Sequence, residues 1–196
     1  MLSDWVRSKT RWLVVPLVRW LGKMGVSPNA LTLLGFLLNV AVGVIAGLGH
    51  LRLAGLCAII SYSFDGLDGA LARETGQTSA FGGFLDSVTD RISEAALFGG
   101  ILWHAMQQGD QMNVALGYAA IIGSLLVSYA RARAEGAGID CKVGLFTRFE
   151  RVAVLIAGLI LGQLRIALWL LAILANVTVV QRMVHVWRVS LEKKAA

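Results

Sequence analysis

Apolar residues fill six long stretches of this chain, and short polar connections separate them. Each stretch is close to the roughly 20 residues that an α-helix needs to cross the hydrocarbon core of a membrane. The pattern therefore predicts six membrane-spanning helices. We expect them at residues 29–48, 53–73, 82–106, 112–134, 146–163 and 166–188.

Residues 2–22 precede the first apolar stretch and alternate between aromatic and basic side chains. Trp5, Trp12 and Trp20 are seven and eight residues apart, so they share one face of a helix. A soluble amphipathic helix packed on a core would show the same spacing. Because long apolar stretches follow, we expect this helix to lie in the headgroup region of a membrane.

The connection Gly25-Val-Ser-Pro28 separates this interfacial helix from the first spanning helix. Serine followed by proline is typical of a helix start, where serine caps free N–H groups and proline occupies the first turn. The sequence thus predicts an all-α integral membrane protein. We expect a single domain over 1–196, in which an amphipathic helix at 2–22 precedes a six-helix bundle at 29–188.

The composition agrees with a membrane protein. The 196 residues are 57% hydrophobic and only 15% charged, with a mean hydropathy of +0.69, whereas soluble domains carry about 25% charged residues. The net charge is +6, and the basic residues flank the apolar stretches, so membrane lipids and phosphorylated substrates are the expected partners. No nucleic-acid recognition motif occurs, and we expect no nucleic acid. Cys57 and Cys141 predict neither a disulfide framework nor a zinc site.

The basic residues also predict an orientation. With the N-terminus in the cytoplasm, 16 of the 18 Lys and Arg residues fall on the cytoplasmic side, and only Arg52 and Arg165 lie outside. Cytoplasmic loops carry such an excess. We therefore expect a multi-pass protein of the cytoplasmic membrane.

Four aspartates occupy helix positions in stretches that otherwise look lipid-buried. Asp65 and Asp68 are three residues apart, and Asp86 and Asp90 are four apart, so each pair shares a helix face. The short connection 74–80 makes the two helices antiparallel neighbours whose acidic faces can converge. Carboxylates near a bilayer are costly and mark functional sites. Ligands with oxygen donors alone favour Mg²⁺ or Mn²⁺, and two such ions about 3.5–4 Å apart are the usual device for phosphoryl displacement.

Small residues accompany the acids. Gly69 and Ala72 lie one turn beyond the first pair, and Gly82 lies one turn before the second. Their missing side chains leave a slot where a nucleotide can approach the backbone, and Arg73 can bind phosphate oxygens in bidentate fashion. Aspartates in a membrane also mark ion or proton transporters. Transport, however, gives no reason for these small residues and the arginine at their offsets.

The complete pattern is Asp-x2-Asp-Gly-x2-Ala-Arg-x8-Gly-x3-Asp-x3-Asp over residues 65–90. It resembles the motif of the CDP-alcohol phosphotransferase family at every position, and the helix plan extends the likeness to most of the chain. The resemblance implies an enzyme of phospholipid biosynthesis that transfers a phosphatidyl-type group from a CDP-linked lipid, such as CDP-diacylglycerol, to an alcohol and releases CMP. It also implies a homodimer and an active site that faces the cytoplasm. A catalytically inactive lipid-binding homologue is a further alternative, which the four intact acids oppose.

The same resemblance implies roles for single residues. Asp65 and Asp86 would contact both metal ions, and Asp68 the first ion alone. Asp90 would ligate the second ion and accept the proton of the acceptor hydroxyl. Residues of the slot and of the start of the first spanning helix would contact the CDP-lipid: Asn29, Ala30, Leu31, Thr32, Gly69, Ala72, Arg73, Ser79 and Gly82.

A second basic cluster lies further along the chain, at Arg131, Arg133, Lys142, Arg148 and Arg151. Some of these residues are explained as anchors to lipid phosphate. Several cations near a di-metal site favour an anionic acceptor such as a sugar or polyol phosphate. The string Ser-Tyr-Ala-Arg-Ala-Arg-Ala-Glu-Gly within this cluster looks like the prokaryotic phosphatidylinositol-phosphate synthases and their archaeal-lipid relatives, which implies inositol 1-phosphate as acceptor. Glycerol 3-phosphate is the alternative, and an uncharged alcohol is less favoured.

Overall fold

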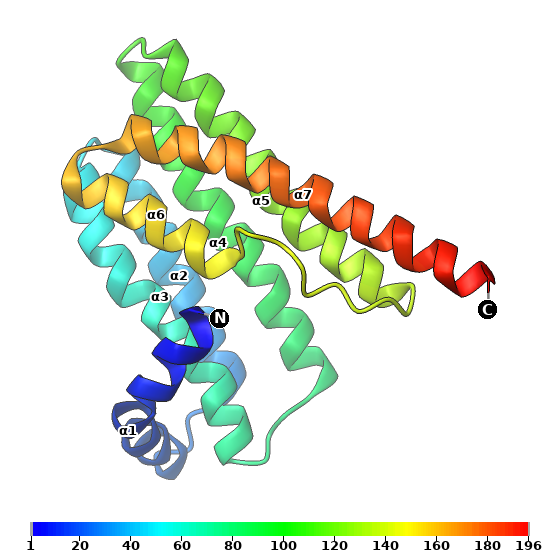
Figure 1. The fold of residues 1–196 in the computed structure, drawn as a ribbon. Coiled ribbons are helices and arrows are strands. Elements are labelled where there is room, and N and C mark those ends of the chain that lie inside the picture. Colours follow the sequence, from blue (N-terminus) through cyan, green and yellow to red (C-terminus); the bar gives the residue numbers. More distant parts are fainter. Residues whose placement is uncertain (1, 196) are drawn as a thin grey trace. The chain divides into compact units, whose positions relative to one another are not determined.

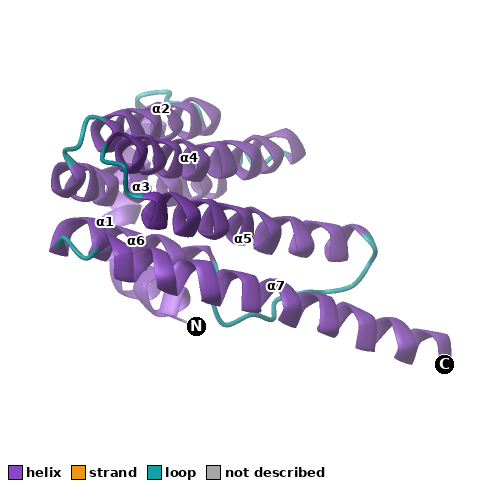
Figure 2. Ribbon diagram, turned by 90° about the horizontal axis from the view of Figure 1, so that it is seen from above, coloured by secondary structure: helices purple, strands orange, loops and turns teal. Residues whose placement is uncertain are grey.

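The computed structural model describes residues 2–195, with side chains at Trp12 and at residues 14–192. This part of the chain contains α-helices joined by short connections and no strand (Figures 1 and 2). The helices are α1 (Leu2–Lys23), α2 (Pro28–Gly47), α3 (Leu51–Glu74), α4 (Ala80–Gln107), α5 (Gln111–Gly136), α6 (Arg148–Leu161) and α7 (Leu164–Ala195). The predicted all-α class is confirmed.

The predicted helix ends agree with the observed ones within two residues, except at the end of α7. Ser27 caps α2, because its hydroxyl oxygen accepts a hydrogen bond from the Ala30 N–H at 3.2 Å, and Pro28 is the first helical residue. Gly162 ends α6 with a φ of 69°, a backbone conformation that glycine adopts without steric cost. Cys57 and Cys141 are both described and form no disulfide.

Within the described residues, three helices are long and apolar enough to cross a membrane: α2, α5 and Leu164–Glu192 of α7. The protein is thus a membrane protein. Helix α6 has 14 residues, which gives it a length of about 21 Å against the roughly 30 Å of a hydrocarbon core. The count of six spans stays a prediction.

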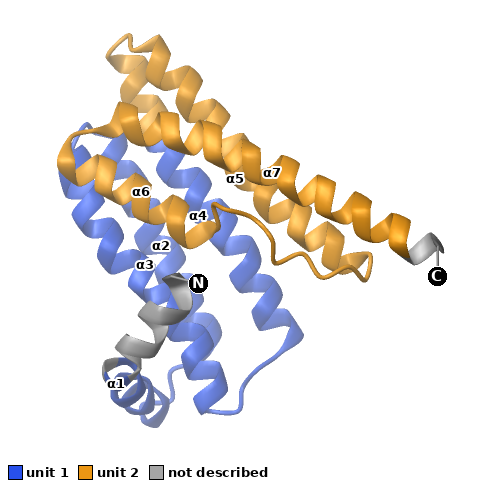
Figure 3. Ribbon diagram, in the orientation of Figure 1, with its two compact units in different colours: residues 1–100 blue, residues 101–196 orange. Residues whose placement is uncertain are grey.

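The chain divides into two compact units, residues 1–100 and 101–196 (Figure 3). In the first unit, α1 packs on α3. Val18, Leu67 and Leu71 of these two helices form a buried cluster with Leu31 of α2. An ion pair between Arg19 and Glu74, at 2.6 Å, joins the same two helices.

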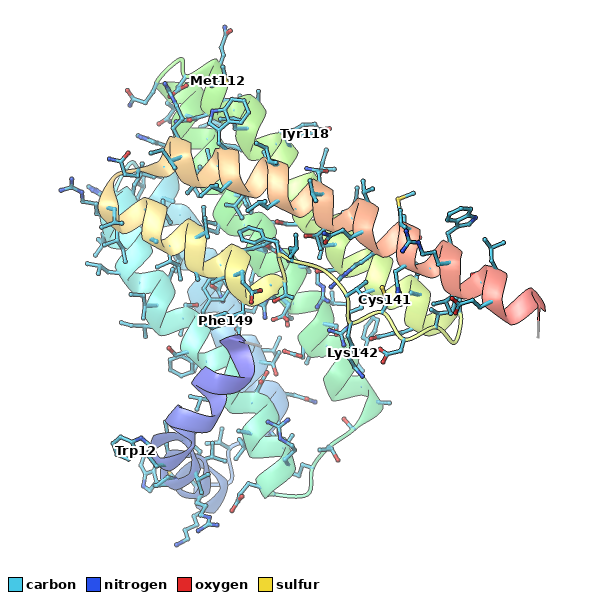
Figure 4. The ribbon with its side chains drawn as sticks, viewed as in Figure 1. Trp12, Met112, Tyr118, Cys141, Lys142 and Phe149 are labelled. Carbon is cyan, nitrogen blue, oxygen red and sulfur yellow. The ribbon has the colours of Figure 1, made fainter. Side chains whose placement is uncertain are left out.

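The indoles of α1 on the predicted membrane face are exposed where they are described. Trp12 is 72% exposed (Figure 4). Trp20 is also exposed, whereas Val18 is buried against α3. Trp5 and the other side chains of residues 2–11 lie outside the described ones. The interfacial position of α1 stays a prediction, and the exposure of two of its three indoles supports it.

Backbone contact joins α2 and α4 in the same unit. A Cβ atom at Gly43 would lie 2.5 Å from the Ala96 carbonyl oxygen, and one at Gly100 would overlap the Gly43 carbonyl oxygen. Small residues let membrane helices approach this closely. Gly47 and Ala96 stand four residues from these glycines, so each helix presents two small residues one turn apart. This contact sets the position of α4, which carries two of the four aspartates.

The second unit is built on α7, which packs against α5 and α6. The Asn176 side-chain amide donates to the Ala119 carbonyl of α5 at 3.2 Å. At the connections, Arg165 forms an ion pair with Asp110 at 2.7 Å. The Asn113 N–H donates to the Asp110 carboxylate at 3.1 Å, and this bond, together with Arg165, lowers the pKa of Asp110 below its ordinary value.

Candidate active site

The first acidic pair lies on the face of α3 that meets α2. Asp68 is 5% exposed, and its Oδ2 accepts a hydrogen bond from the Thr32 hydroxyl at 2.6 Å. A Cβ atom at the buried Gly35 would lie 3.5 Å from Asp65 Oδ1, so Asp65 also faces α2. The two helices therefore share the first pair of carboxylates.

Thr32 stands near the start of α2, four residues after Pro28. A threonine hydroxyl can form hydrogen bonds with its own helix and with a second helix. The Thr32 hydroxyl lies 3.2 Å from the Pro28 carbonyl oxygen of its own helix as well as beside Asp68 of α3. The predicted nucleotide element Asn29–Thr32 forms the first turn of α2. This turn thus lies directly beside the acidic face of α3.

The start of α4 lies against the same turn. The Gly82 N–H donates to the Ser79 hydroxyl oxygen at 3.0 Å, so Ser79 caps α4. A Cβ atom at Gly82 would lie 3.1 Å from Ser79 Oγ and 3.3 Å from Asn29 Oδ1. The structure thus brings together three residues that the sequence predicted for the CDP-lipid.

The second acidic pair follows on α4. Asp86 and Asp90 are both partly buried and lie one turn apart. Arg91 Nη1 lies 3.6 Å from Asp90 Oδ2 and donates to the Ser87 carbonyl oxygen. Glu94, one turn further along the same face, is buried.

Arg73 lies in the last turn of α3 and is exposed. Its Nη1 would lie 3.3 Å from a Cβ atom placed at Gly69. Ala72, beside it, is partly buried. The guanidinium therefore folds over the glycine, and a larger residue at position 69 would displace it.

The donor chemistry of these residues fits a hard cation. All four acids offer carboxylate oxygens, and the Thr32 hydroxyl orients one of them. Within the described residues, no three Asp, Glu, His or Cys side chains stand as a ready metal-binding group. The fit thus rests on the oxygen donors and on the packing of α2 against α3.

The second basic cluster belongs to residues 101–196. Arg131 is exposed and pairs with Glu135 at 2.8 Å, and Arg133 is exposed two residues further on. Lys142 is exposed on the connection between α5 and α6 (Figure 4). It pairs with Asp140 at 3.0 Å.

The two arginines at the start of α6 differ in exposure. Arg148 is the first residue of the helix and is partly buried. Arg151 is buried, and its Nη1 donates to the Phe146 carbonyl oxygen at 3.4 Å. At least part of Arg151 therefore serves the fold, whereas Lys142 is exposed and forms its ion pair with Asp140 at the surface.

Sequence reasoning missed the role of Arg182. The excess of cytoplasmic cations explains this residue only as one of those cations, yet in the structure Arg182 is 4% exposed within α7. Its guanidinium donates to the Val143 carbonyl oxygen at 3.0 Å and to the Val127 carbonyl oxygen. The available signal was a charged residue inside an apolar helix, because charged residues in membrane helices are rare and usually have a structural or functional role.

Comparison with known proteins gives a consistent result. Residues 25–190 match a family model described as CDP-alcohol phosphatidyltransferase. The archaetidylinositol phosphate synthase of Pyrococcus horikoshii is 37% identical over 183 residues, which cover 93% of this chain and 94% of that protein.

Two crystal structures of the Mycobacterium tuberculosis phosphatidylinositol phosphate synthase are also similar. The structure with CDP-DAG bound has a TM-score of 0.84 and 34% identity, and the match covers 89% of this chain and 93% of that one. The structure in complex with manganese and citrate has a TM-score of 0.84 and 33% identity, with 89% and 88% covered.

Proposed function

This chain belongs to the CDP-alcohol phosphatidyltransferase family, and we propose that it transfers the phosphatidyl-type group of a CDP-linked lipid to the hydroxyl of inositol 1-phosphate. The products are a phosphatidylinositol phosphate and CMP. One observation carries the proposal: within the first turn of α2, Asn29 lies beside Gly82 at the start of α4, and Thr32 donates a hydrogen bond to Asp68 of α3. These contacts between residues far apart in the sequence support the proposed binding site for the CDP-lipid.

In this reaction the acceptor oxygen attacks the phosphorus that bears the lipid. A new bond from this oxygen to phosphorus forms, the bond from phosphorus to the bridging oxygen breaks, and CMP leaves with that oxygen. The residues that would hold two Mg²⁺ or Mn²⁺ ions are Asp65, Asp68, Asp86 and Asp90. When bound, these ions supply charge neutralisation for the diphosphate and the leaving group.

Asp90 accepts the proton of the attacking hydroxyl in this proposal. Its partial burial on α4 and its contact with Arg91 at 3.6 Å hold the carboxylate in a defined position. A carboxylate is a weak base for an alcohol, so positioning of the two reactants supplies much of the acceleration. Asp90 needs only hydrogen-bond reach to the hydroxyl.

The CDP-lipid binds against the first turn of α2, the Gly69–Arg73 turn of α3 and the start of α4. Gly82 lets the backbone of α4 approach Asn29, since a Cβ atom there would meet both Asn29 and Ser79. Arg73 provides paired N–H donors for phosphate oxygens. The crystallised mycobacterial relative with CDP-DAG bound supports this class of donor.

For the acceptor phosphate we propose the basic residues Arg131, Arg133, Lys142, Arg148 and Arg151. Two relatives are an archaetidylinositol phosphate synthase and a phosphatidylinositol phosphate synthase, which favours inositol phosphate over glycerol 3-phosphate. Exposed Lys142 is the residue best suited to meet a soluble acceptor.

The membrane arrangement completes the proposal. Six helices, α2 to α7, cross the cytoplasmic membrane, α1 lies in the headgroup region, and the aspartates face the cytoplasm, where soluble acceptors are found. The distribution of Lys and Arg supports this orientation. A homodimer is part of the same proposal.

A CMP-release assay on the purified protein tests the function. With CDP-diacylglycerol and Mg²⁺ we expect CMP when inositol 1-phosphate is added, far less with glycerol 3-phosphate, and none after chelation. Asp90→Asn should lower turnover by about 10²- to 10⁴-fold and leave CDP-lipid binding largely intact, since asparagine keeps the shape of the side chain. Product with glycerol 3-phosphate alone would refute the acceptor. Ion flux across liposomes without any CMP would refute the enzyme and favour a transporter.

A further inference from the structure

The connection between α5 and α6, residues 137–147, is held to α7 through its backbone. The Leu145 N–H donates to the Gln181 side-chain oxygen at 3.2 Å. The Phe146 N–H donates to the Thr178 hydroxyl oxygen, also at 3.2 Å. Side chains of α7 thus replace the hydrogen bonds that a regular element would give these two amides.

Two further contacts continue down the same helix. Arg182 Nε donates to the Val143 carbonyl oxygen at 3.0 Å, and His185 Nε2 lies 3.0 Å from the Asp140 carbonyl oxygen. As α7 runs from 178 to 185, its partners run backwards from 146 to 140. The four contacts therefore form an antiparallel seam between the connection and one helix.

The spacing of these side chains on α7 makes the seam possible. Thr178, Gln181, Arg182 and His185 stand at positions i, i+3, i+4 and i+7, which is one helix face. Thr178 and Arg182 are buried, and Gln181 and His185 are partly buried. A polar face in a helix this apolar needs partners, and the backbone of the connection supplies them.

Side chains of the connection are also buried. Ile139, Cys141 and Phe146 are buried, whereas Lys142 is exposed (Figure 4). Since Cys141 is packed inward, the neighbouring Lys142 points outward.

Close approach at Gly144 fixes the seam further. Its φ is +135°, and a Cβ atom there would lie 2.7 Å from Thr178 Cγ2. A side chain at this position would be strained by the backbone conformation and would collide with α7. The connection can thus follow α7 only with glycine at this point.

We infer that the polar face of α7 is a positioning device for the acceptor: it fixes the connection and so holds Lys142, and the start of α6 with Arg148, in place to bind the acceptor phosphate. This inference rests on the proposed function, because it takes these two cations as acceptor ligands. Thr178 and Gln181 touch no reacting group and act through the backbone of the connection. They set the affinity for the acceptor and leave that for the CDP-lipid unchanged.

Thr178→Val tests this inference, because valine keeps the volume of threonine and removes the hydroxyl that holds the Phe146 N–H. With CDP-diacylglycerol as donor, we expect the KM for inositol 1-phosphate to rise by about three- to tenfold, the loss expected for one hydrogen bond. The KM for CDP-diacylglycerol should stay within about twofold, a change too small to reflect a lost hydrogen bond. Hydrogen exchange at the Leu145 and Phe146 amides should become faster.

Two control variants separate positioning from general damage. Thr178→Ser keeps the hydroxyl and should restore the wild-type KM. Ser190→Ala removes a hydroxyl that bonds only within α7, to the Val186 carbonyl oxygen at 2.7 Å, and should change neither KM. Should Thr178→Val fail to fold, Gln181→Met carries the same expectation through the Leu145 amide.

An unchanged KM for inositol 1-phosphate in Thr178→Val overturns the inference, and so does an equal rise in both KM values. The proposed function is tested separately by the wild type. If the wild type uses glycerol 3-phosphate instead, the same KM comparison applies to that acceptor. If the wild type turns over no phosphorylated acceptor, the proposed function is refuted, and the inference that rests on it is refuted as well.

Discussion

Thr32 and Asp68 are 36 residues apart in the sequence, yet their side chains share a hydrogen bond of 2.6 Å. Asp68 is almost fully buried. Its second carboxylate oxygen accepts a hydrogen bond from the Gly69 N–H at 2.5 Å, so Thr32 is the partner that another helix supplies. Side chains that orient a metal-binding carboxylate commonly change metal affinity by tenfold or more when they are removed. In the proposed site, Thr32 is therefore a partner of the metal centre as well as a neighbour of the CDP-lipid.

Thr32→Val should weaken binding of Mn²⁺ by about tenfold, because valine fills the same space without a donor for Asp68. Thr32→Ser keeps the hydroxyl and serves as the matched variant, with binding close to wild type. Calorimetric titration of Mn²⁺ into the purified proteins measures both. Equal affinities in wild type and Thr32→Val would show that Asp68 needs no help from α2.

A second prediction for a single residue concerns Asp110, at the start of α5, and the pH dependence of stability. The Asn113 N–H and the Arg165 guanidinium both favour its charged form, so its pKa lies below the ordinary value of 3.8. A carboxyl group with a lowered pKa binds fewer protons in the folded state. Its stabilising effect is therefore complete above the ordinary pKa and is lost as the pH falls through the lowered one.

Asp110→Asn isolates this effect, since asparagine still caps the helix but cannot pair with Arg165. At neutral pH the variant should melt below the wild type. At a pH below the lowered pKa the two should melt together, because Asp110 is then neutral in the folded wild type too. Thermal unfolding in detergent micelles at both pH values gives the comparison. A gap that persists in acid would mean that the ion pair is not its cause.

The motif over residues 65–90 predicts which side chains would carry the chemistry, because their spacing within each helix fixes a shared face. It could not predict the contact of Thr32 with Asp68, which depends on how α2 and α3 pack. The contacts of Arg182 were not predicted for another reason. Its charge was already explained by the excess of cations on the cytoplasmic side, and only packing shows that it binds carbonyl oxygens of α5 and of the connection to α6.

Among the elements, α2 and α4 are joined where Gly43 faces Gly100. Gly100→Ala should destabilise the protein by about 1–3 kcal/mol, as overpacking does in well-packed interiors, since its Cβ atom would overlap the Gly43 carbonyl oxygen. The shift of α4 should also lower CMP release. Thermal unfolding in detergent and the CMP assay measure the two effects.

Gly99 provides the control for this prediction, one residue away on the same helix. No atom lies within 4 Å of a Cβ atom placed there. Gly99→Ala should therefore be neutral or slightly stabilising, since alanine loses less conformational entropy in a helix than glycine does. Equal destabilisation by the two changes would contradict the close contact of α2 with α4.

The helices themselves were largely predictable. Long apolar stretches fix their centres, and Ser27, Pro28 and Gly162 fix ends, because capping and positive φ are local properties of the chain. The seam between α7 and the preceding connection was not predictable in the same way. Its four contacts pair residues that are 32 to 45 positions apart, and no periodicity within either segment encodes that register.

At the scale of the whole molecule, the number of membrane crossings is the main open prediction. Six spans place the connection 75–79 in the cytoplasm and the connections 48–50 and 108–110 outside. Helix α6 decides the count, because its 14 residues are short for a crossing. A short helix can cross if the bilayer thins locally or the flanking residues reach the interface. Lipid contact and the proposed dimer both depend on this arrangement.

Single cysteines measure the topology directly. In a background of Cys57→Ala and Cys141→Ala, we expect Gln108→Cys and Gln163→Cys to react with a membrane-impermeant maleimide in intact spheroplasts. Gln77→Cys should react only after permeabilisation, since it lies beside the proposed cytoplasmic site. All three side chains are exposed, so a lack of reaction reports the side of the membrane. Protection of Gln163→Cys beside a reactive Gln108→Cys would mean that α6 does not cross. Labelling of Gln77→Cys in intact spheroplasts would place the aspartates on the outer side, away from cytoplasmic acceptors.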